Sequence, residues 1–278
     1  MIDKIDIQNF KCFLGKEINL KKLTVLAGSN SVGKSSIIQA ILLSRLTIER
    51  LLNNLVVASN LITPTKIYIP LNGRCCLSLG NTKEALIHDA PTNIISFELV
   101  DNQENKTLLL KFKAEDTNDN HYELEWIQNE NSGIEEFNNL KNEFYYLNAE
   151  RIGPRLSYDA DQQDFSHVGY QGEYTLQIIA EKENDEIESK DKRSFPPLSD
   201  YKLLNQIRAW MDYVIPGFYI DYAHLEGKLK KTHASFSKSS PTNVGFGISY
   251  VLPIVVNGLV AKDKSLFVVE NPEAHLHP

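Results

Sequence analysis

The sequence predicts an α/β fold, and three stretches of the chain carry this prediction. The first stretch, up to about Leu26, alternates apolar and polar residues as strands do. The second is a glycine loop followed by a helix, which begins at Ser36 and keeps apolar residues at helical spacing to about Asn53. The third is the continuous apolar run 265–269, expected of a strand buried on both faces of a parallel sheet. We therefore expect a mixed central sheet, to which an antiparallel β lobe and an inserted region are added.

The glycine loop has the pattern of a phosphate-binding P-loop. A predicted strand, Lys22–Ala27, runs into the loop, and the helix follows it directly. Gly28 and Gly33 allow the unusual dihedrals of a loop whose N–H groups point inward. Lys34 can reach the β- and γ-phosphates, Ser35 offers a hydroxyl to Mg²⁺, and the start of the helix favours negative charge. The residues expected to bind the phosphates of a nucleotide with Mg²⁺ are Gly28, Ser29, Asn30, Ser31, Val32, Gly33, Lys34, Ser35 and Ser36.

Acidic residues stand at the tip of the expected strand 265–269. The segment Glu270-Asn-Pro-Glu-Ala-His-Leu-His-Pro278 resembles the Walker B and D-loop region of the ATP-binding-cassette superfamily. Among the members of this superfamily, the segment is similar to the soluble ATPases of the chromosome-maintenance-like and overcoming-lysogenisation-defect-like kinds. The resemblance implies a P-loop NTPase fold of ABC-ATPase type. It also implies that Glu270 and Ser35 hold Mg²⁺, and that residues 274–278, His277 included, form a D-loop against the opposite subunit.

A second glycine segment lies between these two motifs. Asn243-Val-Gly-Phe-Gly-Ile-Ser-Tyr250 precedes an apolar, helix-like run and occupies the position of the superfamily's signature motif. The resemblance implies that Gly245, Gly247 and Ser249 cap the γ-phosphate bound to another subunit, through backbone N–H groups, a hydroxyl and the helix dipole. A homodimer or higher oligomer joined through an ATP sandwich follows. A buried, glycine-rich helix start would give a similar local pattern.

One position departs from the superfamily pattern. The acidic metal-side residue is usually followed by a glutamate that polarises the attacking water, whereas Glu270 is followed by Asn271. An amide cannot accept a proton, and general-base assistance contributes roughly 10²–10⁴-fold to a rate. Glu273, beyond Pro272, is the expected substitute. The predicted catalytic residues are therefore Lys34, Glu270, Asn271 and Glu273, with Asn271 as the position that slows hydrolysis.

Three further segments extend the resemblance. Residues 146–155 and 167–174 look like the insertion of predicted soluble ATPases found in anti-phage and mobile-element loci. Within it, Arg151 and Arg155 suit contacts with phosphate or with a partner's carboxylates, or structural ion pairs with Glu150. Near the N-terminus, Lys11 and Phe13 match a stretch beside the adenine base and phosphates, and each is equally consistent with a strand end.

The expected organisation is a single ABC-type ATPase domain over residues 1–278. The pattern of short strands and polar turns predicts an antiparallel β region at about 65–146, including a strand over 74–79. An inserted, partly helical region is expected at about 147–215. It includes a charged run over 181–197, expected as a surface loop or a partner-facing insertion, and a helix over 199–214. The resemblance implies at least one more helix and strand after Pro278, so we expect the domain to be incomplete at its C-terminus.

Composition limits the classes of partner. The 278 residues carry a net charge of −7, which does not support DNA binding. The three cysteines have no metal-ligand spacing, and no signal peptide or membrane span is evident, which favours a cytoplasmic protein without a membrane partner.

The leading hypothesis is an ATPase that dimerises around Mg·ATP and switches a partner effector. The resemblance suggests a nuclease or another effector in anti-phage defence or DNA maintenance. A nucleotide-gated interaction module with little hydrolysis is the first alternative, because of Asn271. The ATPase subunit of a transporter is the second, and it would require a conventional Walker B glutamate, which the chain lacks.

Overall fold

A computed structural model describes most of the chain. The described residues are 2–58, 66–114, 121–127, 133–155, 157–159, 167–187, 190–226, 231–237, 239–243 and 245–276. The chain divides into two compact units, Met1–Asn142 and Glu143–Pro278, and each is considered by itself.

The first unit is built on a six-stranded antiparallel sheet in the order β2-β1-β4-β5-β6-β3. Strict alternation of buried and partly exposed residues along β4 places Ile95, Phe97 and Leu99 on the buried face, as the period of a strand requires. The strands are β1 (Lys4–Phe10), β2 (Phe13–Asn19), β3 (Ile67–Pro70), β4 (Ile94–Asp101), β5 (Lys106–Lys113) and β6 (Glu123–Ile127).

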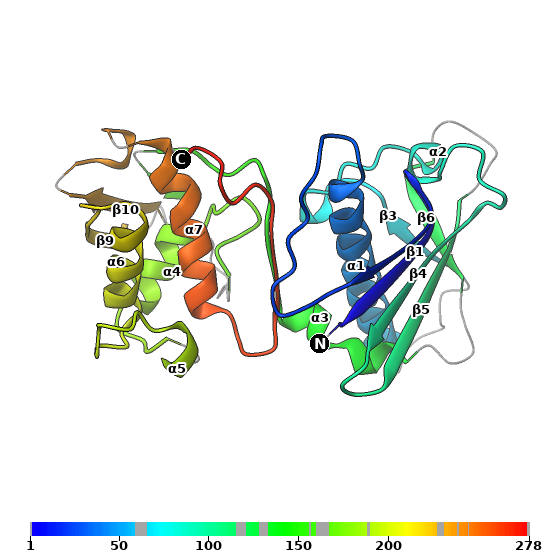
Figure 1. The fold of residues 1–278 in the computed structure, drawn as a ribbon, viewed down its shortest axis with the longest axis horizontal. Coiled ribbons are helices and arrows are strands. Elements are labelled where there is room, and N and C mark those ends of the chain that lie inside the picture. Colours follow the sequence, from blue (N-terminus) through cyan, green and yellow to red (C-terminus); the bar gives the residue numbers. More distant parts are fainter. Residues whose placement is uncertain are drawn as a thin grey trace. The chain divides into compact units, whose positions relative to one another are not determined.

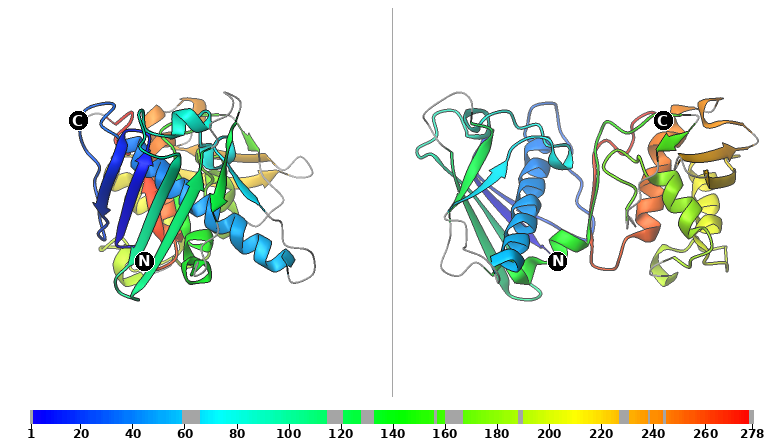
Figure 2. Two further views of the ribbon diagram at one scale, coloured as in Figure 1. Left: turned by 90° about the vertical axis from the view of Figure 1, so that its right-hand side faces the viewer. Right: turned by 180° about the vertical axis from the view of Figure 1, so that it is seen from behind.

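A long helix, α1 (Lys34–Ala58), lies along one face of this sheet (Figures 1 and 2). Its buried residues Leu42, Leu43 and Leu46 recur at helical spacing. On the sheet side the core continues into an aromatic pair, Phe10 and Phe97, whose rings meet edge to face at 5.2 Å. Short elements complete the unit: η1 (Arg74–Cys76), α2 (Thr82–Ala85), η2 (Ile134–Phe137) and α3 (Asn139–Asn142). This packing fixes the direction of α1, whose first turn begins at the glycine loop.

The sheets differ from the single mixed sheet that the sequence predicts. Strands β1 and β2 belong to the same antiparallel sheet as β3, β4, β5 and β6. The parallel pair among the described residues forms a separate two-stranded sheet. The strand predicted over 74–79 is also wrong at its start. There the chain forms η1, with Cys75 and Cys76 at φ angles of +53° and +57°. Such left-handed dihedrals are incompatible with an extended strand.

The strand predicted over Lys22–Ala27 is likewise not formed. Its apolar side chains Leu23 and Val25 are 82% and 75% exposed. A strand requires a neighbour for its backbone groups, whereas here the N–H of Lys21 donates to the Thr24 hydroxyl at 2.8 Å. A local turn of this kind competes with ladder pairing.

The second unit contains a parallel pair of strands, β7 (Phe144–Leu147) and β11 (Leu266–Val269). The strand predicted over 265–269 is thus confirmed as β11, although its residues are only partly buried. The helices are α4 (Thr175–Lys182), α5 (Lys190–Arg193), α6 (Leu203–Val214) and α7 (Phe246–Val260), with the turn η3 (Pro241–Asn243) before α7. A small antiparallel sheet has the order β8-β10-β9, formed by Tyr158–Asp159, Lys231–Phe236 and Ile220–Glu226.

Helices α4, α6 and α7 pack together beside β9 and β10 (Figure 1). Ile178, Ile207 and Val256 are fully buried at the centre of this core. Arg193 donates hydrogen bonds to the carbonyls of Gly258, Ala261 and Lys262, which satisfies the free end of α7. The run 181–197, predicted as a surface loop, therefore includes α5 and a structural arginine. Among the described residues, no helix combines the length and the apolar character needed to span a bilayer.

Candidate nucleotide-binding site

The glycine loop of the first unit closes around its own lysine. The Nζ of Lys34 donates to the carbonyls of Gly28 at 2.7 Å and Ser29 at 2.6 Å. The φ angles of Gly28 and Gly33 are +147° and +98°, a region that favours glycine, and Ser31 is also left-handed at +66°. The loop residues predicted from the sequence thus form one continuous turn around a cationic side chain.

Helix α1 begins at Lys34, two residues before the predicted start, so its first N–H groups lie inside the motif. Ser35 is exposed, which leaves its hydroxyl open to a metal ion. Ser36 is only 9% exposed, and its hydroxyl lies 3.7 Å from the Sγ of Cys12. Of the two serines, only Ser35 has a side chain open to solvent.

The turn between β1 and β2 packs against the loop. A Cβ at Gly33 would collide with the ring of Phe13 and would lie 2.7 Å from the Sγ of Cys12. Phe13 and Cys12 therefore both lie beside the loop, and Cys12 is a neighbour that the sequence reasoning missed. Lys11 is half-buried with a φ of +51°, and its N–H donates to the carbonyl of Ala85 at 2.8 Å.

The residues that follow β11, 270–273, are called the acidic tip. They belong to the second unit, where β7 lies beside β11. The N–H of Glu270 donates to the carbonyl of Leu147 at 2.9 Å, which continues the pairing of β7 and β11. The hydroxyl of Tyr146 donates to the Oε1 of Glu270 at 2.6 Å. Because Tyr146 is 3% exposed and fixed in a strand, this hydrogen bond orients the carboxylate.

Arg151 holds the backbone of the same tip. Its guanidinium donates to the carbonyl of Glu270 and to that of Asn271, the latter at 3.2 Å. Arg151 is 4% exposed, and burial lowers the pKa of its guanidinium, opposed by the charges of Tyr250, Glu270 and Glu273. Both hydrogen bonds that this side chain makes among the described residues go to backbone carbonyls.

Asn271 and Glu273 differ in what they offer to chemistry. Asn271 has a φ of +42°, a conformation that asparagine tolerates better than most residues. Its carbonyl also accepts from the N–H of Ala274 at 3.1 Å, which starts a turn. Glu273 is exposed within that turn. The tip therefore presents one oriented carboxylate, Glu270, and one exposed carboxylate, Glu273.

The glycine segment of the second unit begins helix α7. Gly245 is its N-cap residue without a side-chain capping bond, and both Gly245 and Phe246 are exposed. The predicted D-loop lies over this start within the same chain, since the ring of His275 lies 4.4 Å from that of Tyr250 and 5.7 Å from that of Phe246. His277 falls outside the described residues.

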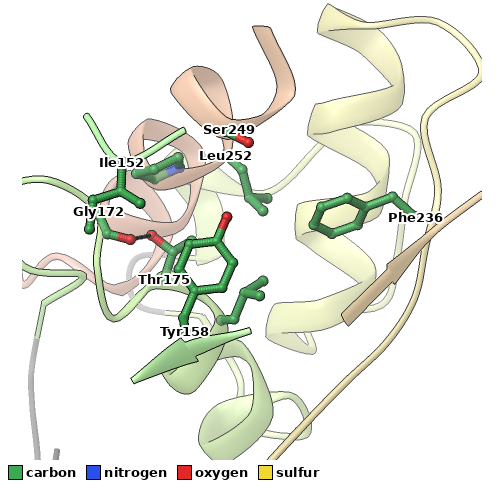
Figure 3. A pocket seen from close by; sticks show the side chains of 9 residues that line it. Ile152, Tyr158, Gly172, Thr175, Phe236, Ser249 and Leu252 are labelled. Carbon is green, nitrogen blue, oxygen red and sulfur yellow. Dashed lines mark hydrogen bonds between the residues drawn. The ribbon is translucent and has the colours of Figure 1, made fainter. Parts of the chain in front are cut away.

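Ser249 faces inward from α7. It is 8% exposed and lines a small hollow with Ile152, Tyr158, Thr175, Phe236 and Leu252 (Figure 3). Burial raises the pKa of Tyr158, opposed by hydrogen bonds from the Arg155 N–H and the Ser249 side chain. In this conformation the hydroxyl of Ser249 is engaged inside the unit, and the exposed N-terminal residues of α7 are the ones open to a ligand.

Gly247 permits the close approach between α7 and residues 275–276. A Cβ there would lie 2.9 Å from the carbonyl oxygen of His275, whereas a Cβ at Gly258 in the same helix would meet open space. We expect Gly247→Ala to displace residues 273–276 and to speed their amide exchange, measured by mass spectrometry. Gly258→Ala is the matched control, expected to raise stability by up to about 1 kcal/mol. Unchanged exchange in Gly247→Ala would contradict this contact.

A glycine loop wrapped around a lysine at the start of a long helix defines a P-loop nucleotide-binding protein. The family model of the AAA ATPase domain matches residues 1–195, and the chain therefore belongs to this family. The family implies ATP binding and hydrolysis, generally with Mg·ATP. The match includes the loop, Tyr146 and Arg151, whereas the acidic tip and α7 lie beyond it. A comparison with curated proteins gave no match.

Proposed function

We propose that this protein hydrolyses Mg·ATP, dimerises around the nucleotide and thereby switches a partner protein. The observation that carries the proposal is the glycine loop, which surrounds the Nζ of Lys34 with carbonyls at 2.6–2.7 Å. An ammonium held there is poised to exchange these carbonyls for phosphate oxygens, and the first N–H groups of α1 add to the attraction. Phosphoryl transfer depends mostly on such positioning and charge stabilisation.

Mg²⁺ would be held by Ser35 and Glu270. Each of these two donors suits a hard cation, since one is a hydroxyl and the other a carboxylate. The Ser35 hydroxyl is exposed at the start of α1, and the Glu270 carboxylate is oriented by Tyr146. When bound, the ion would neutralise the charge of the phosphates. Glu273, the exposed carboxylate of the tip, would accept the proton of the attacking water.

Dimerisation is proposed through the start of α7. Gly245 and Phe246 are exposed there, and the N-cap residue makes no side-chain capping bond, so N–H groups remain for an anion. The resemblance to soluble cassette ATPases is what suggests a second copy's nucleotide as the ligand. The same resemblance is the support for a nuclease or another effector in anti-phage defence or DNA maintenance as the partner.

A nucleotide-gated module with little hydrolysis is the second candidate. The observation that favours it is the left-handed Asn271. Its side-chain amide cannot act as a base, and its backbone carbonyl accepts a hydrogen bond from Arg151. In this candidate ATP is a long-lived ligand that keeps two copies together.

One experiment separates the two functions. Phosphate release is measured with Mg·ATP, together with the molar mass by light scattering in Mg·ATP, Mg·ADP or no nucleotide. ATP-dependent dimers with turnover support the proposed ATPase, and ATP-dependent dimers without turnover support the gated module. A monomer in all three conditions would contradict both forms of the proposal.

The bond between Tyr146 and Glu270 predicts an effect on metal dependence. Tyr146→Phe keeps the buried ring but removes the donor that orients the carboxylate at 2.6 Å. Loss of about 1 kcal/mol of orientation corresponds to about a 5-fold higher Mg²⁺ concentration for half-maximal phosphate release. Tyr145→Phe, on the neighbouring residue of β7, is the control. An unchanged Mg²⁺ dependence in Tyr146→Phe would show that Glu270 does not need this bond.

A further inference from the structure

Arg151 links three segments of the second unit. Its guanidinium donates to the carbonyls of Glu270 and Asn271 at the acidic tip. The same guanidinium lies over the ring of Tyr250 in the first turns of α7, with 5.5 Å between its Cζ and the ring centroid. Tyr250 in turn meets the ring of His275 at 4.4 Å. Arg151 is thus in contact with the acidic tip and with the start of α7, against which His275 packs.

Arg151 is buried and acts on the backbone of the acidic tip. Arg151 is 4% exposed, and its Nε has no hydrogen-bond partner among the described residues. Its bonds go to backbone carbonyls of a left-handed residue and its neighbour, so they fix the direction of the chain rather than neutralise a carboxylate. Arg151 binds the backbone carbonyl of Glu270, and the side chain of the same residue carries the carboxylate. A shift of this peptide therefore also moves the Glu270 carboxylate.

We propose that Arg151 is a positioning residue, which sets the Glu270 carboxylate and couples it to the start of α7. This inference rests on the proposed function, in which Glu270 serves the chain's own nucleotide and α7 serves the nucleotide of a second copy. The planar fork bonds two carbonyls and stacks on Tyr250 at once, which a lysine ammonium cannot do. Arg151 therefore keeps the two surfaces in one relative orientation while each engages its own nucleotide.

The test compares Arg151 with a second arginine that also donates to two backbone carbonyls and lies over a tyrosine ring. Arg208 donates its Nε to the carbonyl of Ile220 at 2.9 Å and its Nη2 to that of Asp221 at 3.2 Å. It also lies over a tyrosine, with 4.4 Å between its Cζ and the centroid of the Tyr219 ring. Arg208→Lys therefore removes the same kind of contacts away from the acidic tip, and it is the control for Arg151→Lys.

The expected result is a separation of turnover from binding. Misplacement of a reacting group by about 1 Å costs up to about 100-fold in rate, so we expect kcat to fall at least about 10-fold in Arg151→Lys. The Kd for ATP should stay within about two-fold, because the phosphate-binding loop around Lys34 is unchanged in this variant. Arg208→Lys should keep kcat, and both variants should have similar melting temperatures.

Two results of the kinetic comparison would overturn the inference. In one, Arg151→Lys retains its kcat; in the other, kcat and the melting temperature fall while the Kd for ATP rises, which describes a structural role. If the wild type hydrolyses no ATP, the proposed ATPase fails and the inference is decided by amide exchange. Protection of residues 270–276 by Mg·ATP in Arg208→Lys but not in Arg151→Lys then supports the coupling. Equal protection in both variants overturns it.

Discussion

Replacing Lys34 by methionine is expected to abolish ATP hydrolysis and to weaken ATP binding at least about 100-fold. Methionine keeps the apolar stem of the side chain, so the start of α1 stays packed, but the charge inside the loop is lost. Two hydrogen bonds from the ammonium, to Gly28 and Ser29, define where the phosphate oxygens would be received. Charge-assisted bonds contribute about 1.5–3 kcal/mol each, so two of them account for a loss of this size.

Equilibrium binding of a fluorescent ATP analogue and phosphate release measure this effect. Lys22→Met is the control, because Lys22 is an exposed lysine shortly before the loop. If the Kd for ATP of Lys34→Met is within a few-fold of the wild-type value, the loop does not form the nucleotide site. An equal loss in Lys22→Met would attribute the effect to the charge of the region rather than to Lys34.

The second large effect is expected at Glu273. Glu273→Gln removes a carboxylate that is exposed in the turn after Asn271 and preserves its shape. If Glu273 is the general base, kcat falls by roughly 10²–10⁴-fold. ATP binding remains, because the loop that binds phosphate is unchanged. ATP-dependent dimers should accumulate in this variant, since the nucleotide that holds them is no longer consumed.

Single-turnover phosphate release and molar mass in Mg·ATP test this prediction. Glu150→Gln, at an exposed glutamate of the same unit, is the matched control. A wild-type rate in Glu273→Gln would mean that the proton goes elsewhere, with Asn271→Glu as the next variant to examine. Tight binding without turnover in the wild type itself would favour the nucleotide-gated module.

The sequence predicted the loop well because its chemistry is local. Gly28, Gly33 and Lys34 lie within seven consecutive residues, so their spacing alone specifies a turn around an ammonium. Strand β11 was also predicted correctly, since a continuous apolar run bounded by polar residues has few other solutions. The roles of Glu270, Asn271 and Glu273 remain predictions, which the variants above address.

Two strands were predicted wrongly, over 22–27 and at the start of 74–79, because strand formation depends on pairing and burial as well as on residue pattern. Lys22–Ala27 has the pattern of a strand, yet Leu23 and Val25 are exposed, because a pattern does not supply the neighbour that a strand needs. Residues 74–79 have strand-like composition as well, but left-handed dihedrals at Cys75 and Cys76 start a turn. No local signal in the sequence marks these two cysteines as left-handed.

The sequence by itself determined the class of this protein, a P-loop ATPase, because a phosphate-binding loop is made of neighbouring residues and their backbone dihedrals. Only the tertiary structure decided the tasks of Tyr146, Arg151 and Ser249. Each belongs to a segment remote in the chain from its partner: Tyr146 orients Glu270, Arg151 holds the backbone after β11, and Ser249 turns into the core. Contacts between distant segments depend on how helices and strands pack, which residue spacing alone does not encode.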